Sequence, residues 1–271
     1  MKRIDIIPTG GLCNRMRAMA SGIFLAQKFH LPATIYWNNS SGLKADFQDL
    51  FQPISLPNIN IVENKKWIYK VLNTKGYLLR LPFLHFKKQV LFNFSSYNKG
   101  DIMPHINLQN KRDLLLVTCF TMCEHYPLRE LFVPQPEIRQ RIEEITGKFA
   151  ENTVGVHIRR TDNYESIRRS PLNLFFEHLE AEIRNDENVM FYVATDSEEV
   201  KNDLKQRFPG HILTCDDKAD RESLEGMKFA VVDFFCLSKT RKIIGSDYSS
   251  YSQIAAELGG IPLEYASSNK S

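Results

Sequence analysis

Short apolar runs alternate with amphipathic segments along most of the chain, and this alternation limits the available folds more than any other feature. Apolar runs of this length are typical of strands buried on both faces, and helical segments between them predict βαβ units with parallel strands. The sequence therefore predicts an α/β fold. Strands are expected at residues 4–7, 33–37, 114–118, 154–158, 189–194, 211–214, 242–245 and 261–263.

The chain is long enough for two domains, because 271 residues exceed the usual size of a single core. Pro134-Gln135-Pro136 interrupts the pattern before a charged helix, so we expect one domain at residues 1–135 and a second at 136–271. Residues 38–110 show no clear period, and no element is predicted there. Helices are expected from Met16 to Phe24 and at residues 137–149, 172–184, 198–207, 226–237 and 252–258.

The strongest functional pattern comes at the end of the run at residues 154–158, where His157, Arg159 and Arg160 lie. In open parallel sheets, ligands bind beyond the carboxyl ends of the strands. An arginine presents a planar fork of donors that suits phosphate oxygens, including those of a diphosphate leaving group that gains negative charge. We therefore predict phosphate binding by both arginines. The alternative is an ion pair between Arg160 and Asp162 that only fixes the loop.

A glycine-rich turn, Gly10-Gly11-Leu12-Cys13-Asn14-Arg15, follows the first apolar run. It has neither the Lys-Ser/Thr pair of a P-loop nor the G-x-G-x-x-G spacing, so it predicts neither ATP nor a dinucleotide. Two interpretations remain open. The turn either joins a strand tightly to a helix, or lets the Gly11 backbone approach a ligand while Asn14 and Arg15 reach across a cleft between the domains.

Polar residues also follow two later runs. Asp196 and Ser197 open the helix expected at residues 198–207, so Asp196 either caps this helix or binds nucleoside hydroxyl groups. Ser249 and Ser250 precede the last expected helix, where hydroxyls and free backbone N–H groups can bind an anion.

Asp233 interrupts an apolar helix, where a carboxylate needs a partner or a ligand. No D-x-D triplet occurs in the sequence, so a metal-bridged diphosphate is not favoured and no metal site is predicted.

Residues 65–100 contain eight basic side chains, interleaved with aromatic ones, and no acidic residue. This segment either binds an acidic glycan or an anionic membrane surface, or has solvated lysines above an aromatic core. The net charge of +3 is too small to indicate nucleic acid, so no such partner is expected.

The sequence favours a soluble, cytoplasmic protein with optional peripheral contact to a membrane. Its five cysteines are scattered, which is typical of reduced thiols. Its amino terminus lacks the apolar core of a secretory signal, and no stretch of about 18 uncharged apolar residues offers a membrane span.

Taken in order, these patterns resemble the fucosyltransferase superfamily, which contains the alpha-1,2- and alpha-1,6-fucosyltransferases, the rhizobial nodulation fucosyltransferases and the protein O-fucosyltransferases. The resemblance covers three motifs, at residues 157–162, 192–196 and 233–250. The turn at residues 10–15 is similar to the start of alpha-1,2-fucosyltransferases, with Cys13 and Arg15 as departures. The middle of the chain is unmatched.

The resemblance implies a GT-B arrangement, in which two Rossmann-like domains face a cleft and the first domain presents a glycan or lipid-linked glycan acceptor. It implies GDP-fucose as donor substrate, inversion at the anomeric carbon, and no metal or other cofactor. Arg159 would hold the β-phosphate and Asp233 would lie near the guanine. The residues expected to bind the nucleotide sugar are Gly11, Asn14, Arg15, His157, Arg159, Arg160, Asp162, Asp196, Asp233, Ser249 and Ser250.

Two departures affect the general base. Asn163 stands where alpha-1,6-fucosyltransferases have a lysine, and Ile167 stands where they have the catalytic carboxylate. Beside Arg159 as a catalytic residue, we therefore expect Glu165 as the base, with Asp162 as second candidate. Two other functions stay open: transfer from another nucleotide sugar, and non-catalytic nucleotide or glycan binding by a degenerate site.

Overall fold

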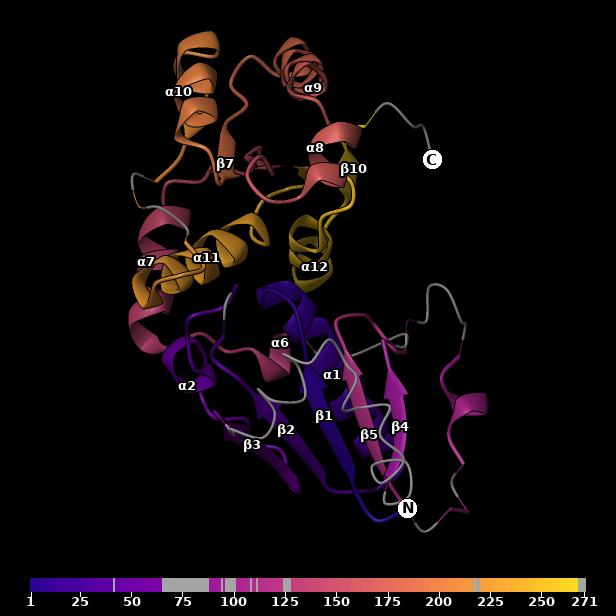
Figure 1. Cartoon of the computed structure of the whole chain (residues 1–271). Helices are drawn as coiled ribbons and strands as arrows, with labels where there is room; N and C mark the ends of the chain where they lie inside the picture. The colour runs from indigo at the N-terminus through magenta and orange to yellow at the C-terminus, as the bar shows by residue number, and fades with distance from the viewer. Residues whose placement is uncertain are drawn as a thin grey trace. The chain divides into compact units, whose positions relative to one another are not determined.

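The chain forms two compact units, Met1–Val133 and Pro134–Ser271, in a computed structural model. Each unit contains a five-stranded parallel sheet flanked by helices (Figure 1). The predicted α/β class is therefore confirmed, whereas the roles assigned to the two domains and the cleft between them stay predictions. The structure describes residues 1–40, 42–64, 88–93, 95, 101–107, 109–110, 112–123, 128–215, 217 and 220–267.

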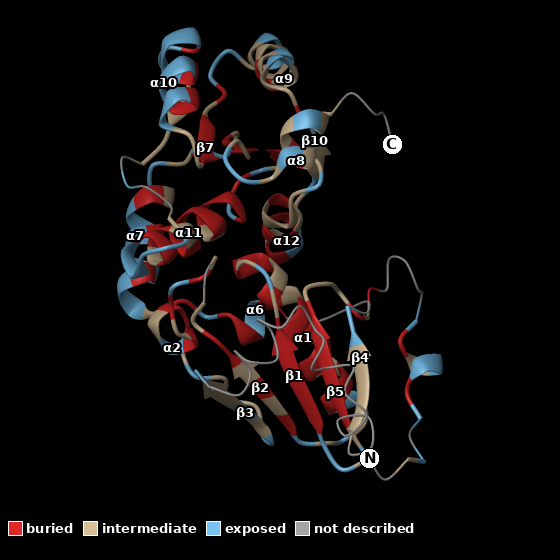
Figure 2. Ribbon diagram, viewed as in Figure 1, coloured by how far each residue is buried: buried red, intermediate tan, exposed pale blue. Residues whose placement is uncertain are grey.

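The first sheet has the strand order β3-β2-β1-β5-β4, and all of its neighbouring strands pair in parallel. The central strand β1 is buried along its whole length, whereas the edge strands β3 and β4 are mostly of intermediate burial (Figure 2). The strands are β1 (Ile4–Pro8), β2 (Ala33–Trp37), β3 (Ile59–Glu63), β4 (Lys88–Phe92) and β5 (Asp113–Thr118).

Helix α1 (Leu12–Lys28) packs against β1 and β2. Its apolar residues recur at helical spacing, and Gly22 allows a close approach, because a Cβ there would lie 2.4 Å from Cδ1 of Ile6. The other helices of this unit are α2 (Phe47–Leu50), the 3-10 helix η2 (Met103–His105) and α6 (Leu128–Leu131).

The second sheet has the order β10-β9-β6-β7-β8, also entirely parallel. Strand β6 lies at its centre with β7 on one side and β9 on the other, so the strand order reverses there, as in Rossmann folds. The strands are β6 (Val154–Ile158), β7 (Phe191–Thr195), β8 (Ile212–Leu213), β9 (Ile243–Gly245) and β10 (Leu263–Tyr265).

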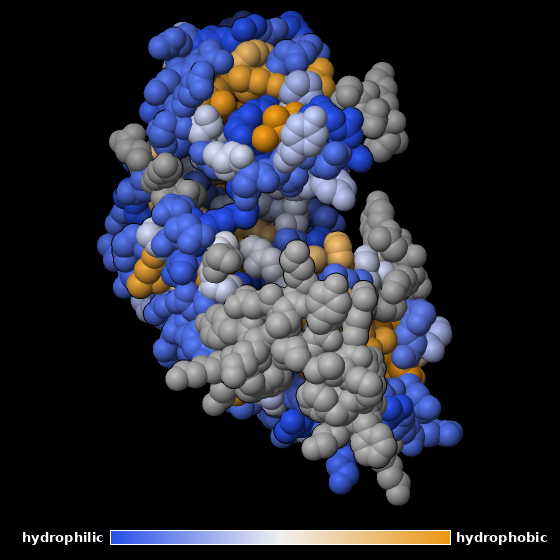
Figure 3. All heavy atoms as spheres, viewed as in Figure 1, coloured by the Kyte–Doolittle hydropathy of each residue, from blue (hydrophilic) through white to orange (hydrophobic). Residues whose placement is uncertain are grey.

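Apolar side chains on one face of the second sheet pack with helical side chains in a buried core, which includes Val156, Phe175 and Phe191. Polar residues cover most of the surface of this unit that is visible in Figure 3. Its helices are α7 (Pro136–Thr146), α8 (Tyr164–Arg169), α9 (Leu172–Asn185), α10 (Glu198–Arg207), α11 (Leu224–Leu237) and α12 (Ser250–Gly259). In the described part of the chain, no helix is both long and apolar enough to cross a membrane.

Strands β3 and β4 and helix α8 were not expected from the sequence. The two strands lie at sheet edges, where half-exposed positions carry polar side chains and no continuous apolar run forms. Helix α8 is a six-residue segment capped by Asn163, whose Oδ1 accepts a hydrogen bond from the Ser166 N–H. Pro171 occupies the N-cap position of α9.

Most of the basic, aromatic segment predicted at residues 65–100 falls outside the described residues, which here include only 88–93 and 95. Lys88, at the start of β4, forms an ion pair with the fully buried carboxylate of Asp5 in β1. Arg3 approaches the same carboxylate at 3.3 Å. Lys88 therefore stabilises the sheet, which corrects both interpretations that placed it on a free basic surface.

We expect Lys88→Met to lower the free energy of unfolding by about 1 to 3 kcal/mol, because Asp5 would lose one of its cationic partners inside the sheet. Urea denaturation measures this change. Lys148→Met, at an exposed position after α7, is the matched control and should change stability by less than about 0.5 kcal/mol. Equal stabilities of the two variants would show that the buried pair contributes nothing.

Candidate functional site

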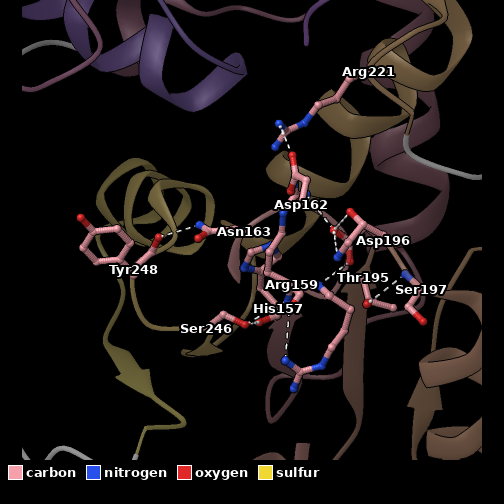
Figure 4. A network of polar contacts seen from close by, with 12 residues as sticks. His157, Arg159, Asp162, Asn163, Thr195, Asp196, Ser197, Arg221, Ser246 and Tyr248 are labelled. Atoms are coloured by element: carbon pink, nitrogen blue, oxygen red, sulfur yellow. Dashed lines mark hydrogen bonds and ion pairs between the residues drawn. The ribbon is translucent and has the colours of Figure 1, made fainter. Parts of the chain in front are cut away.

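The candidate site lies at the carboxyl ends of β6, β7 and β9 in the second unit. In a sheet of this kind, ligands bind where the strand order reverses. The loops after these three strands contact one another there, and Figure 4 shows their side chains in one polar network. The backbone N–H of Arg159 donates to Ser246 Oγ at 3.0 Å, and Asn163 Nδ2 donates to the Tyr248 carbonyl at 3.0 Å.

Arg159 lies between two carboxylates. Its Nη1 is 3.0 Å from Oδ2 of Asp196, and its Nη2 contacts Oδ1 of Asp162. The other oxygen of Asp162 accepts a hydrogen bond from Nη1 of Arg221 at 2.7 Å. Charges therefore alternate along the row Arg221, Asp162, Arg159 and Asp196 (Figure 4).

Asp196 holds the loop that follows β6. Its carboxylate accepts hydrogen bonds from the Arg160 N–H at 2.7 Å and from the Thr161 hydroxyl at 2.7 Å. Burial alone would raise the pKa of Asp196, but Arg159 and these hydrogen bonds outweigh burial and lower it. Of the two residues that open α10, Ser197 caps the helix by accepting from the Val200 N–H, so the capping role does not fall to Asp196.

Arg160 turns towards α9. Its Nη2 donates to the Ser170 carbonyl at 2.8 Å, and its guanidinium lies 5.8 Å from the centre of the Phe175 ring. Burial lowers the pKa of Arg160. The alternative interpretation, a pair between Arg160 and Asp162, is wrong, since adjacent side chains leave an extended chain on opposite sides and it is Arg159 that reaches Asp162.

His157 is 5% exposed and stacks on the ring of Tyr251, with 4.8 Å between the ring centres. Among the described residues, its buried Nδ1 has no hydrogen-bond partner. Burial, reinforced by Arg159, lowers the pKa of His157 to about 3. The imidazole is therefore neutral at physiological pH.

Helix α12 begins beside this network. Ser250 is its first residue, and Ser249 occupies the N-cap position without a side-chain capping hydrogen bond within the helix. Both serines are partly exposed. The first backbone N–H groups of a helix attract anions, so this end can contribute to a phosphate site.

Glu165 lies in the first turn of α8, and its carboxylate pairs with Arg168 at 2.8 Å and Arg169 at 3.4 Å. The hydrogen bond from Arg168 is the main cause that lowers the pKa of Glu165. A general base works best with a pKa near the operating pH, so this environment does not favour Glu165 in that role. Its assignment stays a prediction.

Asp233 in α11 is 5% exposed, and one of its oxygens accepts a hydrogen bond from the Tyr192 hydroxyl of β7. Tyr192 supplies the partner that the sequence required. Burial raises the pKa of Asp233 to about 7, although the hydrogen bond from Tyr192 opposes this rise.

The predicted site residues of the first unit make contacts within that unit. Arg15 is 4% exposed, and its guanidinium donates to the carbonyls of Gly10 and Asn38 and to Oγ of Ser40. These contacts fix the glycine turn. The expectation that Arg15 reaches across a cleft stays a prediction.

The glycine turn also constrains its own neighbours. Gly10 has a φ of +81°, and a Cβ there would lie 2.9 Å from Nδ2 of Asn14. Oδ1 of Asn14 accepts from Nη2 of Arg17 at 2.7 Å, and Gly11 is the N-cap residue of α1. The turn thus has the strand-to-helix role that was one of its two interpretations.

Sequence reasoning missed three contributors to the network. Ser246 could have been found, because it follows the apolar strand β9 directly. Ser170 accepts from the Asp247 N–H at 2.8 Å, and Arg221 contacts Asp162 from a distant loop, so neither has a local signal. No cluster of three or more His, Cys, Asp or Glu side chains that could hold a metal occurs among the described residues.

Solved structures of fucosyltransferases resemble this chain over most of its length. NodZ alpha-1,6-fucosyltransferase of Bradyrhizobium, co-crystallised with GDP, is 18% identical with a TM-score of 0.64, and the match covers 95% of this chain and 93% of that one. An Arg-to-Lys mutant of Arabidopsis thaliana FUT1 in complex with GDP is 14% identical with a TM-score of 0.65. This match covers 97% of this chain and 70% of that one.

POFUT1 in complex with GDP-fucose is 11% identical with a TM-score of 0.57, and the match covers 97% of both chains. No protein-family model matches the chain, and no curated protein matches it in sequence. The resemblance to the fucosyltransferase superfamily is thus confirmed at the level of the fold.

We expect Asp233→Asn to become more stable relative to the unchanged protein as the pH rises from about 4 to about 7. Because the pKa of Asp233 is raised, the unchanged protein keeps a proton in its folded state that its unfolded chain releases in this window. The stability of the unchanged protein therefore falls by up to a few kcal/mol as the pH rises. Asparagine cannot ionise and still accepts from Tyr192. Melting temperatures measured at several pH values test this difference.

The partly exposed Asp186 provides the control, because the hydrogen bond from Asn152 lowers its pKa. Asp186→Asn should show no gain in relative stability between pH 5 and pH 7. A difference between Asp233→Asn and the unchanged protein that stays constant with pH would contradict the raised pKa.

Proposed function

We propose that this protein is a glycosyltransferase of the GT-B type that transfers fucose from GDP-fucose to a hydroxyl group of a glycan or lipid-linked glycan. The observation that carries the proposal is the guanidinium of Arg159, held by Asp196 where the second sheet reverses its strand order. The match to fucosyltransferases that bind GDP or GDP-fucose supports it.

Arg159 stabilises the leaving group in this mechanism. The bond between the anomeric carbon and the β-phosphate oxygen breaks, and its electron pair stays on that oxygen. A guanidinium oriented before the reaction stabilises this growing charge without reorganisation. Asp196 keeps Arg159 oriented through Nη1. The amino end of α12, with Ser249 and Ser250, supplies further donors for the diphosphate.

The acceptor hydroxyl attacks the opposite face of the sugar, which inverts the anomeric carbon, and a carboxylate takes its proton. Glu165 and Asp162 remain the candidate bases, although each already pairs with two arginines. We propose that the reaction needs no metal, because Arg159 and the end of α12 supply the positive charge. Asp233 is proposed to lie near the guanine, and its interaction with Tyr192 orients its carboxyl group.

A non-catalytic protein that binds a nucleotide or glycan is the second candidate. Two observations favour this second candidate. The apolar Ile167 stands in place of the family's catalytic carboxylate, and the hydrogen bond from Arg168 lowers the pKa of Glu165. The release of GDP from GDP-fucose separates the two functions, because a binding protein would retain affinity for GDP without turnover.

We expect GDP to raise the melting temperature more than UDP, ADP or CMP does. A ligand at 100 times its Kd stabilises the folded state by about 2.7 kcal/mol, which a thermal-shift panel detects. The nucleotides should give the same order of melting-temperature shifts in EDTA as in Mg²⁺ or Mn²⁺, because Arg159 and the amino end of α12 neutralise the diphosphate. Equal shifts with UDP would exclude the preference for a guanine donor, and a requirement for metal would exclude the metal-free mechanism.

We expect Arg159→Lys to lower kcat by about 10² to 10³-fold, or about 3 to 4 kcal/mol, because lysine lacks the planar fork that stabilises the leaving phosphate. The melting temperature and GDP affinity should change far less. GDP release from GDP-fucose measures kcat, scanning calorimetry measures the melting temperature, and titration calorimetry measures the GDP affinity. Arg141→Lys, whose exposed guanidinium pairs with Asp217 at 3.1 Å, is the control and should keep its kcat. A near-normal kcat of Arg159→Lys would make Arg159 structural.

A further inference from the structure

Asp162 bridges two guanidinium groups. One of its oxygens contacts Nη2 of Arg159, and the other accepts from Nη1 of Arg221 at 2.7 Å. Figure 4 shows the carboxylate between the two arginines. The two arginines come from different elements, since Arg159 follows β6 and Arg221 precedes α11. One small anion therefore joins two separate parts of the second unit.

The row of charges has an inner half and an outer half. The side chains of Arg159 and Asp196 are 16% and 12% exposed, whereas those of Asp162 and Arg221 are 48% and 45% exposed. Asp196 is also fixed by hydrogen bonds from the loop after β6. A soluble anion can therefore reach the outer half from solvent, while the inner pair keeps Arg159 in place.

We propose that the Asp162 carboxylate occupies, in the ligand-free protein, the place that a phosphate group of the nucleotide takes between Arg159 and Arg221. Asp162 is then a built-in competitor of the diphosphate, and Arg221 becomes a second phosphate-binding residue. The inference rests on the proposed function for the identity of its ligand, a nucleoside diphosphate.

The chemistry of the two anions supports this exchange. A phosphate group offers several oxygens that can bridge two guanidinium groups as a carboxylate does, and it carries more charge. Partly exposed ion pairs such as that of Asp162 with Arg221 are weak, so a diphosphate can displace the carboxylate. The displaced Asp162 stays on the same loop and repels the phosphate, which lowers the affinity for the ligand.

Asp162→Asn tests this competition, because asparagine keeps the size of the side chain and removes its charge. Calorimetric titration with GDP, and separately with inorganic pyrophosphate, should give a Kd about 3- to 10-fold lower than that of the unchanged protein. Asp162→Glu retains the charge and should bind GDP within about 2-fold of the unchanged protein. Arg221→Gln should bind both ligands more weakly.

Asp217→Asn is the matched control, since Asp217 is an exposed aspartate paired with Arg141 in the same unit. It should leave both Kd values unchanged. Unchanged or weaker GDP binding by Asp162→Asn, in a variant whose melting curve shows that it is folded, would overturn the competition while the proposed function stands. If the unchanged protein binds neither GDP nor pyrophosphate, both proposals are wrong.

Discussion

The ion pair between Arg159 and Asp196 organises the candidate site. Asp196 follows β7 and Arg159 follows β6, so the pair joins the ends of two neighbouring strands. The same carboxylate accepts from the backbone N–H groups of Arg160 and Thr161, which sets the path of the loop after β6. An unpaired charge at this degree of burial would destabilise the folded protein, so Arg159 and Asp196 each stabilise the other in its position. The outer contacts to Asp162 and Arg221 depend on this inner pair.

Much of the fold could be predicted because parallel strands buried on both faces must be apolar. Strands β2 and β6 and helix α10 have the predicted bounds, since each is a clear run between polar segments. The half-exposed edge strands carry no such run. At the site, strand ends indicated which loops would meet. They could not indicate pairings, because the choice between Arg159 and Arg160 as partner of Asp162 depends on side-chain directions at the end of β6.

The two units show different uses of arginine. Arg15 directs its guanidinium to carbonyl oxygens of its own turn, and with 4% exposure it stabilises the local backbone. Arg159 directs its guanidinium to carboxylates at the end of a strand. Both arginines come shortly after a buried strand, so residue type and place in the sequence do not separate a structural arginine from one that can bind an anion. The partners separate them, since a charged partner can be exchanged for a ligand anion and a backbone carbonyl in a turn cannot.

The charges of the site also bear on catalysis. A site that must bind a diphosphate needs positive charge, and the same charge lowers the pKa of nearby carboxylates and makes them poorer bases. Glu165 illustrates the conflict, because its arginine neighbours keep it ionised. A carboxylate can serve as base here only if ligand binding draws those arginines away from it. The proposed exchange of Asp162 for a phosphate meets this condition. The diphosphate would bind the guanidinium groups of Arg159 and Arg221, and the Asp162 carboxylate would then be able to accept a proton.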